Sequence, residues 1–385
     1  MPASGRDLPD AEGPWFLVLN DRFGGRKSVS TRPGADTHRL RMVARYLPFA
    51  DCRCRSDIAF DNGGMQVCSG RQLLLSGRQS SGVIHRSLEC HGATFGQAGD
   101  SIMNIRNANK VDAQRCGRIL YDAFNNLAER HNFPPDFPSP EVATGLASML
   151  IDDPGFYGVV AEEAGTIVGS NFMDERSTIF GIGPISVAPE VQNHAVGRRL
   201  MCAVLDRAAA KKAAGIRLVQ AGYHNRSLCL YTKLGFVTRE PLSLLGGPKP
   251  NAKFAGYDVR LAEERDVEGC NKLCREVHGF DRDRELRDAI RARSASVVEH
   301  FEKITGYATA IGFLAHAVAR TNQDLKALIG AAKEFPGPGF LLPTRNHEVF
   351  DWCLSCELKL VFQMTLMTTG LYNEPAGAYL PSILY

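Results

Sequence analysis

The sequence predicts a mixed α/β fold, an α+β arrangement with a mixed sheet, in which one module is followed by a degenerate copy of itself. Two observations lead to this. Strand-like and helix-like segments alternate regularly from Met103 onward, and the segments after Phe254 repeat the earlier pattern. The length of 385 residues leaves room for two or three domains, and an apolar fraction of 44% is ordinary for a globular protein.

The first 102 residues differ in composition from the rest. They are rich in Arg, Gly and Ser, and Lys27 is their one lysine. They show no sustained period of 3.6 or 2, so they are not expected to bury enough apolar surface to offset the entropy of ordering. We predict a disordered extension over residues 1–102, or one that does not belong to the native protein.

Bulk properties exclude several classes of function. A net charge of +3 is too small to indicate nucleic acid or an anionic membrane as a partner, and no apolar stretch approaches membrane-spanning length. The eleven cysteines are an odd number without a framework spacing, and no signal peptide is evident. A cytoplasmic protein with reduced thiols is expected. The pairs Cys52/Cys54 and Cys353/Cys356 lack a second ligand pair, so no metal is predicted.

The first module, residues 103–246, has the predicted order β-α-α-β-β-β-α-β-α-β. Helical spacing of apolar residues from Ala113 to Leu127 indicates the first helix, and the run from Ser139 to Glu141 starts the second with a serine cap and a proline in the first turn. Strands are expected over residues 158–161, 166–172, 182–187 and 216–220, and from Phe236. Further helices are expected over residues 197–214 and 227–234.

A strand-to-helix connection carries the chemistry. The strand ends at Val187, and small residues at Ala195 and Gly197 precede a helix. The free N–H groups of a helix N-terminus bind anions such as pyrophosphate, and Arg198 and Arg199 add positive charge at the same end. An ordinary turn with surface arginines is the alternative.

The pattern Gln192-x-x-Ala195-x-Gly197 resembles the pyrophosphate loop of the GNAT N-acetyltransferases, Q/R-x-x-G-x-G/A. The resemblance implies that the strand ending at Val187 splays from its neighbour and that its main chain pairs with the pantetheine arm of acetyl-CoA. Alanine replaces the usual glycine at position 195, which requires that its φ stay negative. The cofactor-binding residues that the resemblance implies are Ile185, Val187, Gln192, Asn193, His194, Ala195, Val196, Gly197, Arg198, Arg199 and Asn225.

A second match lies one helix and one strand further on. Residues 225–236 resemble the family signature N-x-x-x-x-x-Y-x-x-x-G-F, which places Asn225 at the cofactor arm and Tyr231 beside the thioester sulfur as general acid. A phenol at that place can donate to the departing thiolate. A core tyrosine bonded to the backbone is the alternative for Tyr231.

The implied reaction is direct attack of an amine on the acetyl thioester in a ternary complex. The base stays open: Glu162, Glu163, Asp174, Glu175, His194 and His224 lie near the motifs, but each has a structural interpretation as well. In the family, the loop from Phe133 to Pro138 shapes the acceptor site, and its aromatic residues favour a partly apolar acceptor.

Residues 254–385 repeat the module in degenerate form. Asn346 and Trp352 stand six residues apart, as do Asn225 and Tyr231, and the run from Gly306 to Phe313 echoes the strand over residues 168–172. No phosphate-loop pattern lies between residues 319 and 335, and tryptophan is too weak an acid to replace tyrosine. The copy is therefore expected not to turn over but to complete the acceptor site or stabilise the first module. By the resemblance, the segment after Leu366 is a last strand that closes the sheet.

Two hypotheses of different classes follow. The first is an acyltransferase that acetylates a primary amine, small or on a protein, without a metal, nucleic acid or membrane partner. The second is a non-catalytic acyl-CoA-binding sensor. The acceptor, the base, oligomer formation and cofactor binding by the copy stay open.

Overall fold

The computed structural model describes residues 103–192 and 194–385. The extension predicted over residues 1–102, including Cys52 and Cys54, lies outside the described residues. Within them, no helix is both long and apolar enough to cross a membrane.

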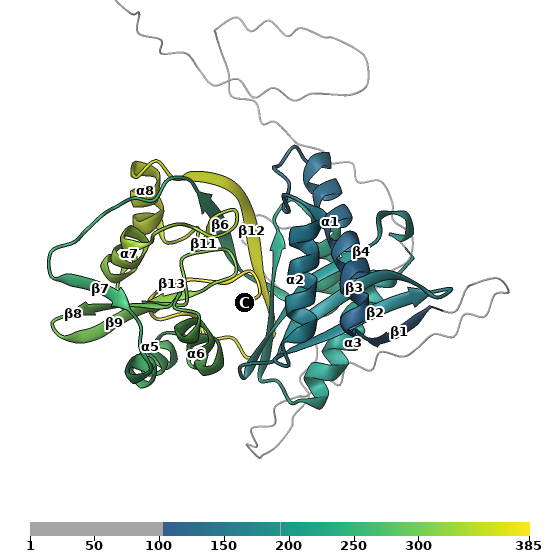
Figure 1. Cartoon of the computed structure of the whole chain (residues 1–385), viewed down its shortest axis with the longest axis horizontal. Coiled ribbons are helices and arrows are strands. Elements are labelled where there is room, and N and C mark those ends of the chain that lie inside the picture. Colours follow the sequence, from purple (N-terminus) through teal and green to yellow (C-terminus); the bar gives the residue numbers. More distant parts are fainter. Residues whose placement is uncertain (1–102, 193) are drawn as a thin grey trace, which may run out of the picture. The chain divides into compact units, whose positions relative to one another are not determined.

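The first ten elements follow the predicted order without exception (Figure 1). Local signals account for them: α1 presents an apolar stripe, Pro140 opens α2 in its first turn, and Ala164 and Gly165 adopt the positive φ of a tight turn between β2 and β3. The elements are β1 (Asn104–Asn107), α1 (Ala113–Arg130), α2 (Pro140–Asp152), β2 (Phe156–Glu163), β3 (Thr166–Asp174), β4 (Ile179–Val187), α3 (Val196–Ala210), β5 (Gly215–Ala221), α4 (Asn225–Lys233) and β6 (Val237–Gly246).

The remaining elements repeat this order and end with one extra strand. They are β7 (Tyr257–Leu261), α5 (Val267–His278), α6 (Asp283–Arg291), β8 (Ser296–His300), β9 (Lys303–Ala308), β10 (Ala317–Ala319), α7 (Asn322–Ala331), β11 (Phe340–Pro343), α8 (His347–Ser355), β12 (Lys359–Gly370) and β13 (Ala378–Leu380). The predicted repeat is thus confirmed at the level of elements.

Matching ion pairs show that the repeat extends to side chains. Arg106 on β1 binds Asp112 at 2.7 Å and Glu162 at 2.8 Å. Arg260 on β7 binds Asp266 at 2.7 Å and Glu299 at 2.5 Å. Each aspartate also closes a capping box before the first helix of its module. The two modules therefore fix their first strand and first helix by the same contacts.

The larger of the two sheets contains strands from both modules. The larger sheet has the order β1-β2-β3-β4-β5-β12-β6-β11, so β12 lies antiparallel between β5 and β6. The segment that the resemblance implied to be a sheet-closing strand is β12, an interior strand of this sheet, and β11 lies at the edge. The long strand β6 of the first module pairs with β11 and β12 of the second. The long strand β12 of the second module pairs with β5 and β6 of the first. The proposed division into residues 103–246 and 254–385 stays a prediction.

Helices cover both faces of the first part of this sheet. Apolar residues of α3, including Leu200 and Val204, pack with Tyr231 of α4 against one face. Residues of α1 and α2, including Ile119 and Ala147, pack against the other face (Figure 1). The candidate site lies at the end of β4, beyond the part of this strand that pairs with β5.

One predicted strand is shorter than expected. The run from Gly306 to Phe313 was expected to be extended, but β9 ends at Ala308. The chain then turns back, because Thr309 N–H donates to the carbonyl of His316 at 2.9 Å. This leaves residues 310–315 as part of the connection between β9 and β10.

Candidate functional site

The site begins where β4 and β5 part. The two strands pair in parallel from Ile179 opposite Gly215 to Ile182 opposite Leu218, and the pairing stops there. The register of β4 with β3 also shifts between Ile182 and Ile185, which marks a bulge. The predicted splay of the strand that ends at Val187 is therefore confirmed.

Main-chain donors of β4 face this opening. Ala188 N–H donates to the carbonyl of Val168 on β3 at 2.9 Å. Successive N–H groups of a strand point to opposite edges, so those of Val187 and Ile185 face away from β3. On the same edge, the carbonyl of Val187 accepts a hydrogen bond from Gln192 Nε2 at 3.2 Å. The opening thus presents strand-edge N–H groups that an extended ligand with amide carbonyls can bind.

The connection from β4 to α3 forms the expected turn and helix start. Val196, Gly197 and Arg198 make up the first turn of α3, whose leading N–H groups have no partner within the helix. No side chain caps this end. A Cβ at Gly197 would meet nothing closer than 3.8 Å, so the space over this turn is open. The helix start is therefore available to an anion.

Ala195 overturns one expectation. It precedes the helix with φ 59° and ψ 8°, in the left-handed region, whereas a negative φ was expected for a non-glycine residue. The turn requires this conformation to bring the chain from the loop into α3. Alanine there is strained, because its Cβ crowds the following carbonyl oxygen at a cost of roughly 1–2 kcal/mol.

Replacing Ala195 by glycine should therefore stabilise the protein. We expect Ala195→Gly to raise the free energy of unfolding by about 0.5–1 kcal/mol, since relief of the strain exceeds the extra chain entropy that glycine loses. Urea denaturation measures this. Ala209→Gly within α3 is the matched control and should lower stability by about 1 kcal/mol. A loss of stability in Ala195→Gly would contradict the strain argument.

The predicted basic residues occupy different places. Arg198 lines the cavity described below, whereas Arg199 Nη2 donates to the carbonyl of Met103 at 2.8 Å and does not line it. His194 is exposed and is also absent from the lining. Asn193 lies outside the described residues. Arg198 is thus the arginine placed to act beside the helix start.

Tyr231 reaches the same opening from α4. Its side chain is only 6% exposed, packs edge-on against Phe236 at 6.2 Å, and lines the cavity. Burial raises the pKa of its phenol to about 12, and a hydrogen bond with Ser227 acts in the opposite direction. The hydroxyl is therefore fully protonated at neutral pH. Asn225, the first residue of α4, lines the cavity as well.

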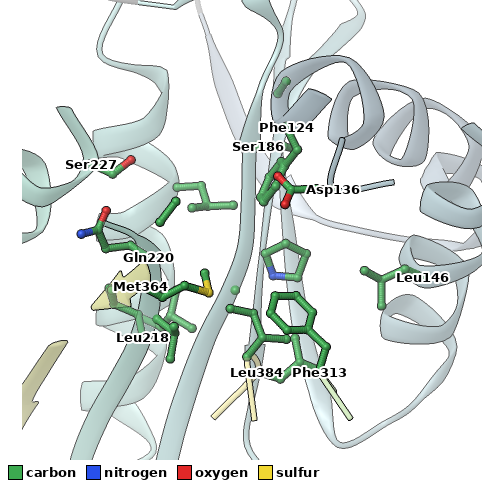
Figure 2. Close-up of a pocket in the computed structure, with 18 of the residues that line it drawn as sticks. Phe124, Asp136, Leu146, Ser186, Leu218, Gln220, Ser227, Phe313, Met364 and Leu384 are labelled. Carbon is green, nitrogen blue, oxygen red and sulfur yellow. The ribbon is translucent and has the colours of Figure 1, made fainter. Parts of the chain in front are cut away.

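These features border one cavity of about 1510 Å³. This exceeds the roughly 300–1,000 Å³ of pockets for single small ligands, so two substrates fit together. Residues of the second half form part of its wall: Glu285 and Asp288 from α6, Phe313 from the connection after β9, and Leu384 beyond β13. Figure 2 shows Phe313 and Leu384 together at one end of the cavity.

The carboxylates named as candidate bases already have structural roles. Glu162 pairs with Arg106, Asp174 with Arg176 at 2.6 Å, and Glu175 with Arg207 at 2.8 Å. Glu163 does not line the cavity. His224 lines it, but burial lowers the pKa of its imidazole to about 4, and its Nδ1 bonds Ser227 Oγ at 2.7 Å. A neutral imidazole engaged in this way is a poor proton acceptor near pH 7.

Two functional candidates escaped the sequence reasoning. Asp136 lines the cavity from the loop between α1 and α2, with its carboxylate directed inward in Figure 2. Gln220 on β5 is 5% exposed, lines the cavity, and its amide nitrogen and oxygen have no hydrogen-bond partner among the described residues. Such an orphaned amide costs roughly 1–3 kcal/mol, which a polar ligand in the opening would recover. Gln220 is a polar residue at the end of a predicted strand, and this feature of the sequence could have marked it as a candidate.

The equivalent places in the second module are closed. Thr321 and Asp324 form a capping box at the start of α7, in which Thr321 Oγ1 accepts from Asp324 N–H and the Asp324 carboxylate accepts from Thr321 N–H, whereas no side chain caps α3. Beside β10, β13 pairs antiparallel from Ala317 opposite Leu380 to Ala319 opposite Ala378. Trp352 packs against Phe254 at 6.1 Å. The chain itself thus takes up the strand edge and the helix start that the first module presents to a ligand.

Comparison with known proteins agrees with this geometry. Residues 154–238 match the family model of the acetyltransferase (GNAT) domain, which spans β2 to the start of β6 and contains both motifs. No curated protein matches the chain. The match supports acyl transfer as the class of reaction.

One solved structure extends the likeness beyond that domain, and two others are also similar to the chain. A proposed acetyltransferase from Pyrococcus horikoshii is 18% identical, with a TM-score of 0.57 over 75% of this chain and 98% of its own. A GCN5-related N-acetyltransferase from Sphaerobacter thermophilus is 13% identical, with a TM-score of 0.49 over 71% and 96%. A tandem GNAT protein from the clavulanic acid biosynthesis pathway is 13% identical, with a TM-score of 0.45 over 73% and 100%. The first of these shows that the fold is shared across both halves of the chain.

Proposed function

We propose that this chain, which carries an acetyltransferase (GNAT) domain over residues 154–238, transfers the acetyl group of acetyl-CoA to a primary amine. The observation that carries the proposal is the single opening between β4 and β5. It brings strand-edge donors, an uncapped helix start and a buried phenol together around one cavity.

Each part of acetyl-CoA has a matching surface. The first turn of α3 offers backbone N–H groups and the positive end of the helix to the pyrophosphate, and Arg198 adds charge beside it. The N–H groups of Ile185 and Val187 suit the amide carbonyls of the pantetheine arm. The amide of Gln220 is a further partner at the same opening. The thioester would then lie near Tyr231.

In this mechanism Tyr231 stabilises the leaving group. The amine attacks the thioester carbonyl carbon, the C–S bond breaks, and negative charge develops on sulfur, to which the phenol donates a hydrogen bond. A thiol ionises near pH 8.5 in the case of cysteine, well below the pKa of about 12 of Tyr231. Tyr231 therefore acts by this hydrogen bond, while complete transfer of its proton would be uphill.

In this proposal the second module contributes to the binding site of the acceptor amine. Its side chains wall the cavity, while its own strand edge and helix start are occupied by its chain. Loss of independent turnover is compatible with that role. The acceptor would then bind between the loop after α1 and the residues that the second module contributes.

Titration calorimetry with acetyl-CoA, together with a thiol-release assay against a panel of amines, tests the proposed function. We expect one acetyl-CoA site per chain and amine-stimulated release of CoA. Thr321→Ala/Asp324→Ala, which uncaps α7, is the matched control and should not change the first-module affinity. Binding without amine-stimulated release with any amine would overturn the proposal in favour of an acyl-CoA sensor.

A further inference from the structure

Asp136 has unused bonding capacity inside the cavity. Its carboxylate makes no hydrogen bond or ion pair among the described residues, although it lines the same cavity as Tyr231. In Figure 2 it lies on the side formed by Phe124 and Leu146, across from Gln220 and Met364. A carboxylate partly removed from water without a partner is costly, so its retention calls for a ligand that satisfies it.

The other carboxylates of the cavity are already paired. Glu285 binds Arg282 at 2.7 Å and His316 at 2.9 Å. Asp288 pairs with Arg291 and lies 3.9 Å from Arg176. Asp136 is therefore the carboxylate of the cavity lining that can engage a cation or take a proton from a substrate.

The loop that carries Asp136 is held in place by its neighbours. Asn125 on α1 clamps the main chain of Phe137 with two hydrogen bonds: its Nδ2 donates to the Phe137 carbonyl at 2.9 Å, and its Oδ1 accepts from Phe137 N–H at 3.1 Å. The Phe137 ring packs edge-on against Phe124 at 5.9 Å. The clamp fixes the residue next to Asp136 and so orients the carboxylate, as a preorganised base requires.

Apolar side chains form much of the cavity wall around Asp136. Phe124 and Leu146 come from α1 and α2, and Phe313 and Leu384 come from the second half of the chain. Tyr223 also lines the cavity, where its ring stacks on Phe133 at 4.4 Å and packs edge-on against Phe362 at 5.7 Å. A chamber of this kind favours an apolar carbon frame with one polar head.

From this geometry we propose that the acceptor is a primary amine on an apolar alkyl or arylalkyl group, and that Asp136 is the base that receives its proton. The inference rests on the proposed acetyl transfer and deepens it. The amine nitrogen forms a bond to the acetyl carbonyl carbon, and the C–S bond breaks with its electron pair going to sulfur. One proton leaves the nitrogen for the Asp136 carboxylate, which gives the acetamide, the thiolate of CoA and a protonated Asp136.

The protonation of Asp136 sets a testable pH dependence. Burial raises the pKa of its carboxyl to about 6, so it is ionised at pH 7 and becomes protonated, and inactive as a base, below about pH 6. The other charged or titratable residues that line this cavity are Arg130, His131, Arg176, Arg198, Tyr223, His224, Arg226, Cys229, Tyr231, Lys233, Glu285 and Asp288. Among them, His131 is an alternative candidate for the proton acceptor that lines the cavity from the same connection as Asp136, so it needs its own variant.

Steady-state kinetics of Asp136→Asn, Asp136→Glu and His131→Gln between pH 5 and 8 test the inference. For the wild type, a plot of log kcat/KM against pH should rise with slope one, because the amine in solution loses its proton as the pH increases. Below about pH 6 the slope should be two, because Asp136 must also be deprotonated there. Asp136→Asn should lose this additional unit of slope and lower kcat/KM about 10²-fold or more, while its acetyl-CoA Kd stays unchanged. Asp136→Glu should restore part of the rate, and His131→Gln should keep the wild-type profile.

The amine panel tests the acceptor class. Hexylamine and 2-phenylethylamine should exceed glycinamide and 1,4-diaminobutane by about tenfold or more in kcat/KM, because each methylene that is buried on binding stabilises the complex. Asp122→Asn, on the exposed side of α1, is the matched control and should behave as wild type. Wild-type rates in Asp136→Asn, or a preference for the polar amines, would overturn the inference while leaving acetyl transfer intact. Absence of turnover in the wild type with every amine would instead overturn the proposed function.

Discussion

Tyr231→Phe should lower kcat by about 10²-fold while the Kd for acetyl-CoA changes by less than about threefold. The variant keeps the ring that packs against Phe236 and removes only the hydroxyl. A 10²-fold loss corresponds to about 2.7 kcal/mol of transition-state stabilisation, the size expected for one hydrogen bond to a developing negative charge in a site sheltered from water. The effect should fall on kcat and kcat/KM alike, because the sulfur carries that charge only as the C–S bond breaks.

Two further measurements make this result specific. Tyr157→Phe removes a hydroxyl that bonds Asn107 at 2.9 Å outside the cavity, and it should leave kcat unchanged. Single-turnover acetyl transfer in Tyr231→Phe should be slowed as much as steady-state turnover. Wild-type kcat in Tyr231→Phe would show that Tyr231 serves only in packing.

Arg282→Met should lower the free energy of unfolding by about 3–5 kcal/mol, the cost of leaving a buried charge without its partner. Arg282 is 6% exposed and binds Glu285, while its Nη2 donates to the main-chain oxygen of Tyr385 at 2.5 Å. Glu285 also binds His316, which bonds the Tyr307 hydroxyl at 3.0 Å. Despite its burial, Arg282 and then His316 hold the pKa of Glu285 below its ordinary value, so this carboxylate stays ionised and loses most when Arg282 is removed.

Urea denaturation at pH 7 measures this loss, and a double variant identifies its cause. Arg282→Met/Glu285→Leu removes both charges and should recover much of the stability. Arg118→Met breaks an exposed pair with Asp122 and should leave the urea midpoint nearly unchanged, because solvent screens such a pair. If the double variant is as unstable as Arg282→Met, the loss comes from packing against the Tyr385 ring, which lies 5.1 Å from the guanidinium, and not from the unpaired charge.

Local signals in the sequence determined the order of the elements and the register of the two motifs. Helical spacing from Ala113, the proline at the start of α2 and the tight turn at Ala164 and Gly165 act within a few residues. Both motif residues of α4 line the cavity: Asn225 is its first residue, and Tyr231 is the buried residue near its end. Such features depend on the neighbouring chain alone, so they can be predicted from it.

The tertiary structure decided which strands pair and which side chains share the cavity. The placement of β12 between β5 and β6 depends on strand edges far apart in sequence, for which no local pattern codes. Asp136, Gln220 and Leu384 meet around one cavity only after that exchange of strands and the return of the chain beyond β13. Ala195 adopts a positive φ because the path from β4 into α3 demands it, against the preference of alanine itself. The sequence by itself thus determined the cofactor side of the proposed site, whose contacts are local, and the assembled fold decided the acceptor side, whose residues come from both halves of the chain.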